Sequence, residues 1–131
     1  MGNERVEEQL LQQHIVHFPP YLMQKIFENV KEGIMITNVA GEILAVNAAF
    51  EFVTGYTCEE VLGKTPKILQ SGVHTKDFYS NMWQSIRETG EWQGEIWNRR
   101  KTKDIYPEWL NIFQVRSADG EHIYNCAIFT D

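Results

Sequence analysis

The most informative segment of this chain is Gly41-Glu42-Ile43-Leu44-Ala45-Val46-Asn47-Ala48-Ala49-Phe50. Its apolar run predicts a short strand, and residues 38–41 before it contain the Asn and Gly that favour a tight turn. Asn47 is a good N-cap residue, so a helix is expected to begin at Ala48. Residues 33–37 form a second β-branched run. The segment therefore predicts a β-hairpin that leads directly into a helix.

Short helices are predicted after this hairpin. Residues 57–60 (TCEE) form a capping box for a helix of one or two turns that ends at Gly63. Residues 66–72 are expected to be a loop. Thr75 then caps a longer amphipathic helix, and Gly90 ends it.

Strands and helices are predicted in segregated blocks. Three strands are expected at about 92–101, 104–116 and 121–130, separated by tight turns. Upstream, the spacing of apolar residues predicts an amphipathic helix at residues 4–17 and a further helical segment at residues 21–30. The order predicts an α+β fold: one five-stranded antiparallel sheet with short helices on one face and an N-terminal flanking helix.

Composition narrows the function. The 131 residues carry a formal net charge of −6, which disfavours binding to nucleic acid and to acidic membrane surfaces. Cys58 and Cys126 lack the spacing of a metal or redox site, and no common catalytic signature is present, so we expect neither a metal site nor an enzyme. Without a membrane-spanning run or a signal-peptide pattern, a cytoplasmic protein with no membrane insertion is expected.

A family resemblance rests on several motifs in the right order. Residues 41–50, residues 54–56 (TGY) and residues 59–64 (EEVLGK), together with the order of elements, resemble a PAS domain. The resemblance covers residues 21–131 and implies a PAS sensor domain there, preceded by an amphipathic helix and linker at residues 1–20.

The resemblance also implies a role in signalling. The ending Thr130-Asp131 is similar to the junction at which PAS domains connect to a signalling helix. This similarity implies a sensor domain of a larger bacterial regulatory protein, with an output domain downstream. A histidine kinase of a two-component system, or a cyclic-di-GMP cyclase or phosphodiesterase, is the output that the family suggests.

Two segments resemble the flavin-type branch of the family, which includes the FAD-binding PAS domains of nitrogen-fixation regulators and the blue-light LOV domains. They are residues 92–101 and residues 66–69 (PKIL). The resemblance implies that Asn98 hydrogen-bonds a flavin ring, and a carboxamide offers the donor and acceptor that this requires. FAD is therefore the most specific cofactor candidate, and a cofactor-free interaction domain is the alternative.

The chain departs from the LOV pattern at three positions. Pro66 stands where LOV domains have the cysteine that forms the flavin adduct, which excludes that photochemistry. Glu108 and Phe129 replace a second flavin-binding Asn and a Gln. A redox FAD or a cavity without flavin remain the two alternatives.

The alternation of side chains along the strands identifies the candidate ligand residues. Alternate side chains of a strand point to opposite faces, so taking Asn98 as inward places Glu108 inward too. The residues that we predict to bind a ligand in the cavity between sheet and helices are Asn98, Glu108, Trp92, Ile96, Leu110, Ile112 and Phe129. The alternative is a filled core in which Asn98 and Glu108 bond only to the backbone or to each other.

The same alternation of side chains predicts that the outer face of the sheet is apolar. Such a face is unusual on an isolated monomer and typical of an interface. We expect the N-terminal helix and a second subunit to cover this face, so a homodimer is predicted. The predicted dimer-interface residues are Leu10, Leu11, Ile15, Trp97, Trp109, Phe113, Tyr124 and Ile128.

Overall fold

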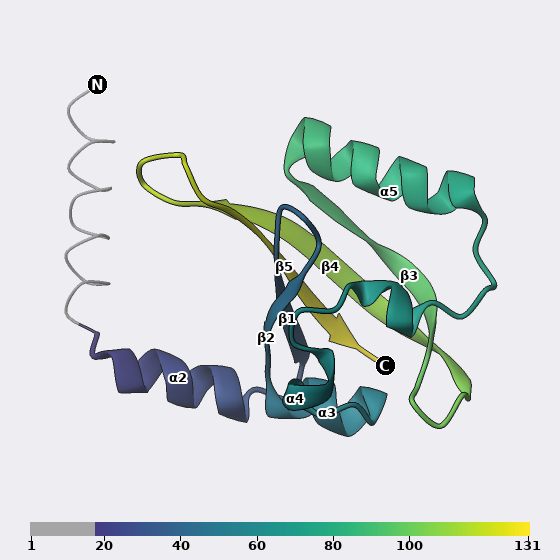
Figure 1. The fold of residues 1–131 in the computed structure, drawn as a ribbon, viewed down its shortest axis with the longest axis horizontal. Helices are drawn as coiled ribbons and strands as arrows, with labels where there is room; N and C mark the ends of the chain where they lie inside the picture. The colour runs from purple at the N-terminus through teal and green to yellow at the C-terminus, as the bar shows by residue number, and fades with distance from the viewer. Residues whose placement is uncertain (1–17) are drawn as a thin grey trace.

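Five antiparallel strands form one sheet in the order β2-β1-β5-β4-β3 (Figure 1). The structure is a computed structural model that describes residues 18–131, so the predicted helix at 4–17 lies outside the described residues. The described elements are α2 (Pro20–Asn29), β1 (Gly33–Asn38), β2 (Ile43–Val46), α3 (Ala48–Thr54), α4 (Cys58–Val61), the 3-10 helix η1 (Pro66–Leu69), α5 (Lys76–Thr89), β3 (Glu91–Arg99), β4 (Ile105–Arg116) and β5 (Ile123–Thr130).

The predicted hairpin and the three-strand block are both present. β1 pairs with β2 on one side and with β5 on the other, so the first and last strands meet at the centre of the sheet. β4 pairs with both β3 and β5. The predicted α+β class and strand number are confirmed.

Asn47 fixes the start of α3. Its Oδ1 accepts hydrogen bonds from the backbone N–H of Phe50 (3.0 Å) and of Ile34 (2.8 Å), and its Nδ2 donates to the carbonyl of Glu32 (2.9 Å). The predicted N-cap is therefore confirmed, and the same side chain ties α3 to β1. No residue separates β2 from α3 other than Asn47.

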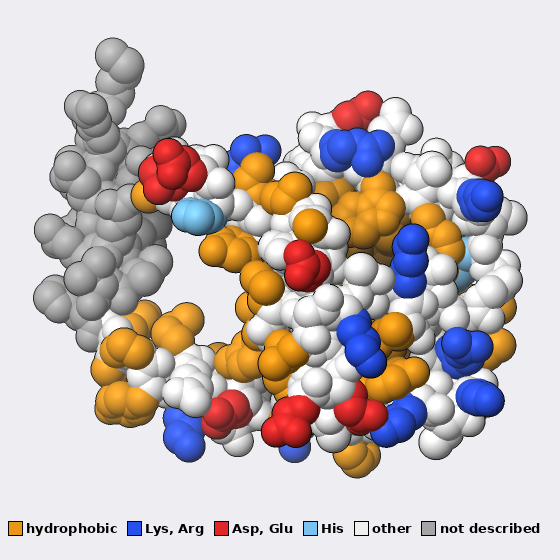
Figure 2. All heavy atoms as spheres, viewed as in Figure 1, with side chains coloured by type: hydrophobic (Ala, Val, Ile, Leu, Met, Phe, Trp, Pro, Cys, Tyr) orange, Lys and Arg blue, Asp and Glu red, His pale blue; other side chains and the backbone are white. Residues whose placement is uncertain are grey.

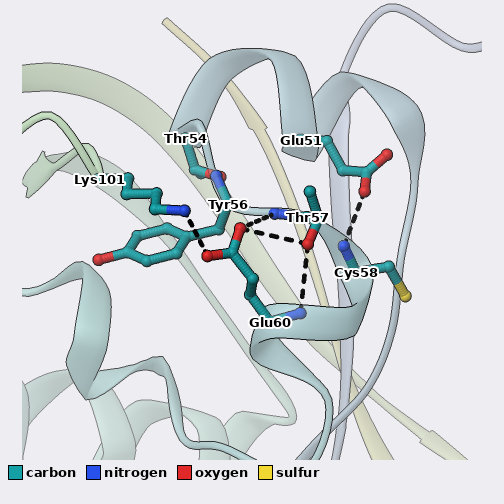
Figure 3. A network of polar contacts seen from close by, with 7 residues as sticks. All are labelled: Glu51, Thr54, Tyr56, Thr57, Cys58, Glu60 and Lys101. Carbon is teal, nitrogen blue, oxygen red and sulfur yellow. Dashed lines mark hydrogen bonds and ion pairs between the residues drawn. The ribbon is translucent and has the colours of Figure 1, made fainter.

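The capping box of α4 is confirmed (Figure 3). The Thr57 hydroxyl accepts from the Glu60 N–H (3.3 Å), and the Glu60 carboxylate accepts from the Thr57 N–H (2.9 Å). Lys101 forms an ion pair with Glu60, and the Glu51 carboxylate accepts from the Cys58 N–H (2.7 Å). Because Lys101 follows β3, these contacts connect the short helix to the edge of the sheet.

Two local predictions need correction. Residues 66–72 were expected to be a loop, but Pro66–Leu69 form a 3-10 helix, which Pro at the first position favours because its φ is already helical. The helix α4 ends at Val61, before Gly63. The hydrogen bond of the Gly63 N–H to Ile43 holds the chain against β2 instead.

The helices pack on one face of the sheet. α3 contacts β1, α4 contacts β2, and α5 contacts β3 and β4. The most completely buried side chains are Phe50, Ile43, Ile86, Val61 and Thr54. They form the core between this helical layer and the sheet, whose buried residues alternate along β4 and β5 as the parity argument predicted.

A glycine allows a close contact between β1 and β5. Gly33 lies opposite Phe129, and a Cβ at residue 33 would come within 2.2 Å of the Phe129 ring. The ring also packs edge-to-face on Phe50, with centroids 6.0 Å apart. Only glycine leaves room for the Phe129 side chain in this position.

Both edges of the sheet are partly paired. Ile43 in β2 exchanges backbone hydrogen bonds with Gly63 and Lys64 (2.9 and 2.8 Å). On β3, an isolated bridge joins Gln70 to Asn98, and the Trp97 N–H donates to His74 Nε2 (2.9 Å). No helix among residues 18–131 is long and apolar enough to cross a membrane.

Candidate functional site

A cavity of about 310 Å³ lies between the inner face of the sheet and the segments η1 and α5. Its volume lies at the lower end of the range for small-molecule sites. Apolar side chains form most of its wall, including Leu69, Met82, Ile96, Leu110, Ile112 and Phe129. The predicted inner-face cavity is therefore present.

The cavity opens near the turn between β1 and β2. Of the residues that line it, only Ala40, Thr65 and Lys67 are exposed, and the others are buried or half-buried. The opening thus lies between this turn and η1. Figure 2 shows hydrophobic side chains gathered between α5 and the β1–β2 hairpin, with Lys and Arg side chains around them.

A buried polar pair lies away from this opening. Asn98 Nδ2 donates to Glu108 Oε1 (2.6 Å), and the two residues are only 7% and 4% exposed. Burial raises the pKa of the Glu108 carboxyl to about 7, while the hydrogen bond from Asn98 opposes the increase. Glu108 therefore changes its charge near neutral pH.

Tyr106 and Arg100 complete this polar end. The Arg100 guanidinium lies 3.9 Å from the centroid of the Tyr106 ring. Burial, followed by the nearby Glu108 carboxylate, raises the pKa of Tyr106, which keeps the phenol neutral. Neither Glu108 Oε2 nor the Tyr106 hydroxyl has a hydrogen bond of standard geometry within the described chain.

Two more buried polar atoms on the cavity wall lack partners within residues 18–131. They are the Tyr79 hydroxyl on α5 and Asn125 Oδ1 on β5. Burial raises the pKa of Tyr79. Because buried polar groups in proteins are nearly always hydrogen-bonded, these atoms indicate a ligand or ordered water in the cavity.

The family model for the PAS fold matches residues 21–131. The chain belongs to the PAS family. Two curated relatives are regulatory or sensory proteins. The nitrogen fixation regulatory protein of Klebsiella oxytoca is 29% identical over 118 residues, which are 90% of this chain and 23% of the relative. The aerotaxis receptor of Escherichia coli is 30% identical over 70 residues, which are 53% of this chain and 14% of the receptor. This PAS domain thus spans less than a quarter of either relative's length.

Solved structures share the fold of this PAS domain. A PAS domain from Colwellia psychrerythraea has a TM-score of 0.78 at 22% identity, covering 85% of this chain and 94% of that one. An RNA-binding light-oxygen-voltage receptor also has a TM-score of 0.78 at 22% identity, covering 86% of this chain and 33% of the receptor. The PAS fold predicted from the motifs is confirmed.

Six of the seven predicted ligand residues of this PAS domain line the cavity: Asn98, Glu108, Ile96, Leu110, Ile112 and Phe129. Trp92 does not. Its ring packs edge-to-face on Phe78 of α5, with centroids 5.9 Å apart. Parity correctly placed Trp92 on the inner face, but this contact with α5 holds the ring outside the cavity. Whether the lining residues bind a ligand stays a prediction.

Several lining residues were not predicted. Met35 and Thr37 come from β1, and Tyr79, Met82 and Trp83 come from α5. The alternation of β1 and the helical spacing of the three α5 residues were visible in the sequence. The position of α5 over the sheet could not be predicted from the sequence. That position decides whether these residues line a cavity or pack in a filled core.

The predicted interface residues that the structure describes do lie on the other face of the sheet. Trp97 is 37% exposed and Trp109 is 53% exposed. Phe113, Tyr124 and Ile128 are half-buried. The predicted interface residues Leu10, Leu11 and Ile15 lie outside the described residues, and dimerisation stays a prediction.

Proposed function

We propose that this PAS domain is the sensing module of a larger regulatory protein and that its cavity holds a small ligand, with FAD as the first candidate. The observation that carries the proposal is an apolar cavity that contains the buried Asn98–Glu108 pair. Such a pair at the end of an apolar cavity would orient a ligand and select its polar edge.

The lining residues fit a flavin ring. Leu110 and Ile112 on the sheet and Met82 on α5 supply apolar walls, and Asn98 and Glu108 supply hydrogen-bond donors and acceptors for a heterocyclic edge. Bound flavin would supply redox chemistry. The protein would hold the ring, exclude water from it, and present a carboxyl group that gains or loses a proton near pH 7.

Occupancy can reach the output through the strands that line the cavity. Leu110 faces the cavity, whereas the neighbouring Trp109 faces the outer surface. A ligand that favours one arrangement of β4 and β5 would therefore bias both the outer face and Asp131 at the end of β5. We propose that the change passes through a dimer interface to an output domain.

An absorption spectrum of the freshly purified domain tests the flavin. We expect visible flavin absorbance, or a rise in the midpoint of thermal unfolding when FAD is present during refolding. The Asn98→Leu variant should lose either signal, while Asn111→Leu on the exposed face of β4 should keep it. A colourless protein that FAD does not stabilise removes flavin from the proposal.

A second candidate function is a cofactor-free dimerisation domain. The observation that favours it is the exposed aromatic surface at Trp97 and Trp109, because exposed apolar patches typically mark interfaces. Sedimentation should show a dimer for the wild type and a monomer for Trp97→Glu combined with Phe113→Glu. Gln84→Glu, on exposed α5 surface, is the control and should stay dimeric. A folded double variant of unchanged mass would contradict this interface.

The larger protein belongs to the same proposal. We place the domain at residues 21–131, with residues 1–20 as a flanking segment, in a cytoplasmic regulator without catalytic activity of the domain's own. A histidine kinase or a cyclic-di-GMP cyclase or phosphodiesterase is the proposed output. The support is that two relatives are a nitrogen fixation regulator and an aerotaxis receptor. Sequencing the gene downstream of residue 131 tests it directly.

A further inference from the structure

We infer that the cavity contains a second polar subsite, formed by Asn125 and Thr37, that binds a hydrogen-bond donor on a chain attached to the ligand's ring. This inference rests on the proposed ligand-binding function. It adds that the ligand is elongated and carries polar groups at two separate places.

The first argument is the state of the Asn125 side chain. Asn125 is 8% exposed, lines the cavity, and has no partner for Oδ1 within residues 18–131. The other inward residues that follow it on β5, Ala127 and Phe129, are apolar. An unpaired buried carbonyl oxygen is unfavourable, so a ligand that donates to it gains affinity by restoring the hydrogen bond.

Thr37 places a second polar group beside Asn125. The two residues are opposite each other in the pairing of β1 with β5, so their side chains lie on the same face and close together. Thr37 is 4% exposed and also lines the cavity. A hydroxyl and a carboxamide at one place can accept from a ligand hydroxyl and donate to it.

The separation of the two polar places sets the ligand's length. Asn125 lies opposite Gln114 of β4, and Glu108 lies earlier on the same strand. From Glu108 to Gln114 the strand rises about 20 Å at roughly 3.4 Å per residue. Apolar Leu110 and Ile112 lie between them on the inner face. A ligand that uses both places must therefore be extended, with an apolar middle.

The subsite lies on the side of the opening. Ala40, in the turn that directly follows β1, is exposed and lines the cavity. A ligand whose ring is held by Asn98 and Glu108 would therefore direct its chain past Asn125 towards solvent. The chemical class that fits is a heteroaromatic ring with a hydroxylated chain.

A comparison of two flavins distinguishes binding at the proposed subsite from binding of the ring. Riboflavin carries a hydroxylated chain, and lumiflavin has the same ring with only a methyl group there. We expect wild type to bind riboflavin more tightly, and Asn125→Leu to weaken riboflavin binding about tenfold while leaving lumiflavin unchanged. Fluorescence titration measures both affinities.

Three control variants make the result specific. Glu108→Gln should weaken both flavins, because both present the same ring edge. Asn111→Leu makes the same substitution on the exposed face of β4 and should change neither. Thr37→Val keeps the side-chain shape and should repeat the riboflavin loss, so it decides the matter if Asn125→Leu does not fold.

The outcomes separate the two proposals. A wild type that binds neither flavin overturns the flavin proposal and this inference with it. A wild type that binds both equally, or variants at Asn125 and Thr37 that weaken both flavins alike, overturns the subsite and leaves the flavin proposal in place.

Discussion

The inner face of the sheet has a filled region and a hollow region. Under α3 and α4, the side chains of Ile43, Phe50 and Val61 are 0 to 1% exposed. Under η1 and α5, similar apolar side chains line a cavity. The two regions differ in how their helices are attached to the sheet, not in hydrophobicity.

The attachments explain the difference. Asn47 is the only residue between β2 and α3, and its side chain binds the backbone on both sides of the start of β1, so α3 is held tightly against the sheet. The start of α5 is separated from η1 by residues 70–75. Short, bonded connections thus close one region, while the longer connection leaves space in the other.

The largest effect should come from the filled region. Phe50→Ala removes a fully buried ring and should lower the free energy of unfolding by about 3–5 kcal/mol. Met82→Ala, at the cavity wall, should cost about 2 kcal/mol, near the low end for such truncations, because part of its surroundings is already empty. Urea unfolding measures both, and equal losses would contradict the distinction between the regions.

The ionisation of Glu108, in the hollow region, should give the next largest effect on stability. The pKa of Glu108 rises from 4.5 to about 7 on folding, so the folded state favours the protonated carboxyl. Its contribution to stability is complete below about pH 4.5 and is lost as pH rises through about 7. Glu108→Gln should therefore match the wild type at pH 4 and be more stable by about 3 kcal/mol at pH 8.

Urea unfolding at a series of pH values checks this prediction. Glu95→Gln, at an exposed position of β3, is the control and should follow the wild-type pH profile. A constant difference between Glu108→Gln and wild type over the whole range would show that Glu108 does not titrate in the folded state as proposed.

Gly33 tests the boundary between the two regions. Gly33→Ala forces the Phe129 ring away from a Cβ that would lie 2.2 Å from it, and Phe129 contacts both Phe50 and the cavity. We expect a loss of about 2 kcal/mol. Adding Phe129→Leu should recover part of that loss. Strictly additive effects in a double-mutant cycle would argue against the contact.

The smallest effect should come from the surface at α4. Hydrogen bonds from Lys101 and from the Thr57 backbone lower the pKa of Glu60 to about 2. The contribution of Glu60 to the stability of the folded state is therefore present above about pH 4.5 and is lost as pH falls through 2. Glu60→Gln should lower the melting temperature slightly at pH 7 and not below pH 2. Glu59→Gln, which keeps the capping box, should change it less, and identical shifts would contradict the role of Glu60.

Local chemistry made much of the fold predictable. Asn47, Thr57 and Thr75 cap their helices as the sequence indicated, because a cap depends on residues within one turn. Strand alternation likewise placed Asn98 and Glu108 on the inner face, since parity needs only one correct reference residue.

The cavity itself could not be predicted from the sequence. The filled-core alternative correctly anticipated that Asn98 and Glu108 bond to each other, yet the cavity exists beside them. Whether Tyr79 and Trp83 line a cavity, and whether Trp92 packs on α5 instead, depends on the distance of α5 from the sheet. That distance results from packing over many residues, and no local pattern encodes it.

The hydrogen bonds along the two edges of the sheet restrict how the domain can associate. Gly63 and Lys64 occupy part of the free side of β2, and Gln70 and His74 occupy part of the free side of β3. Unpaired edges are the usual templates for amyloid-like growth. With these edges partly covered, a concentrated solution of the domain should form assemblies of fixed size through its faces and not fibres that lengthen strand by strand.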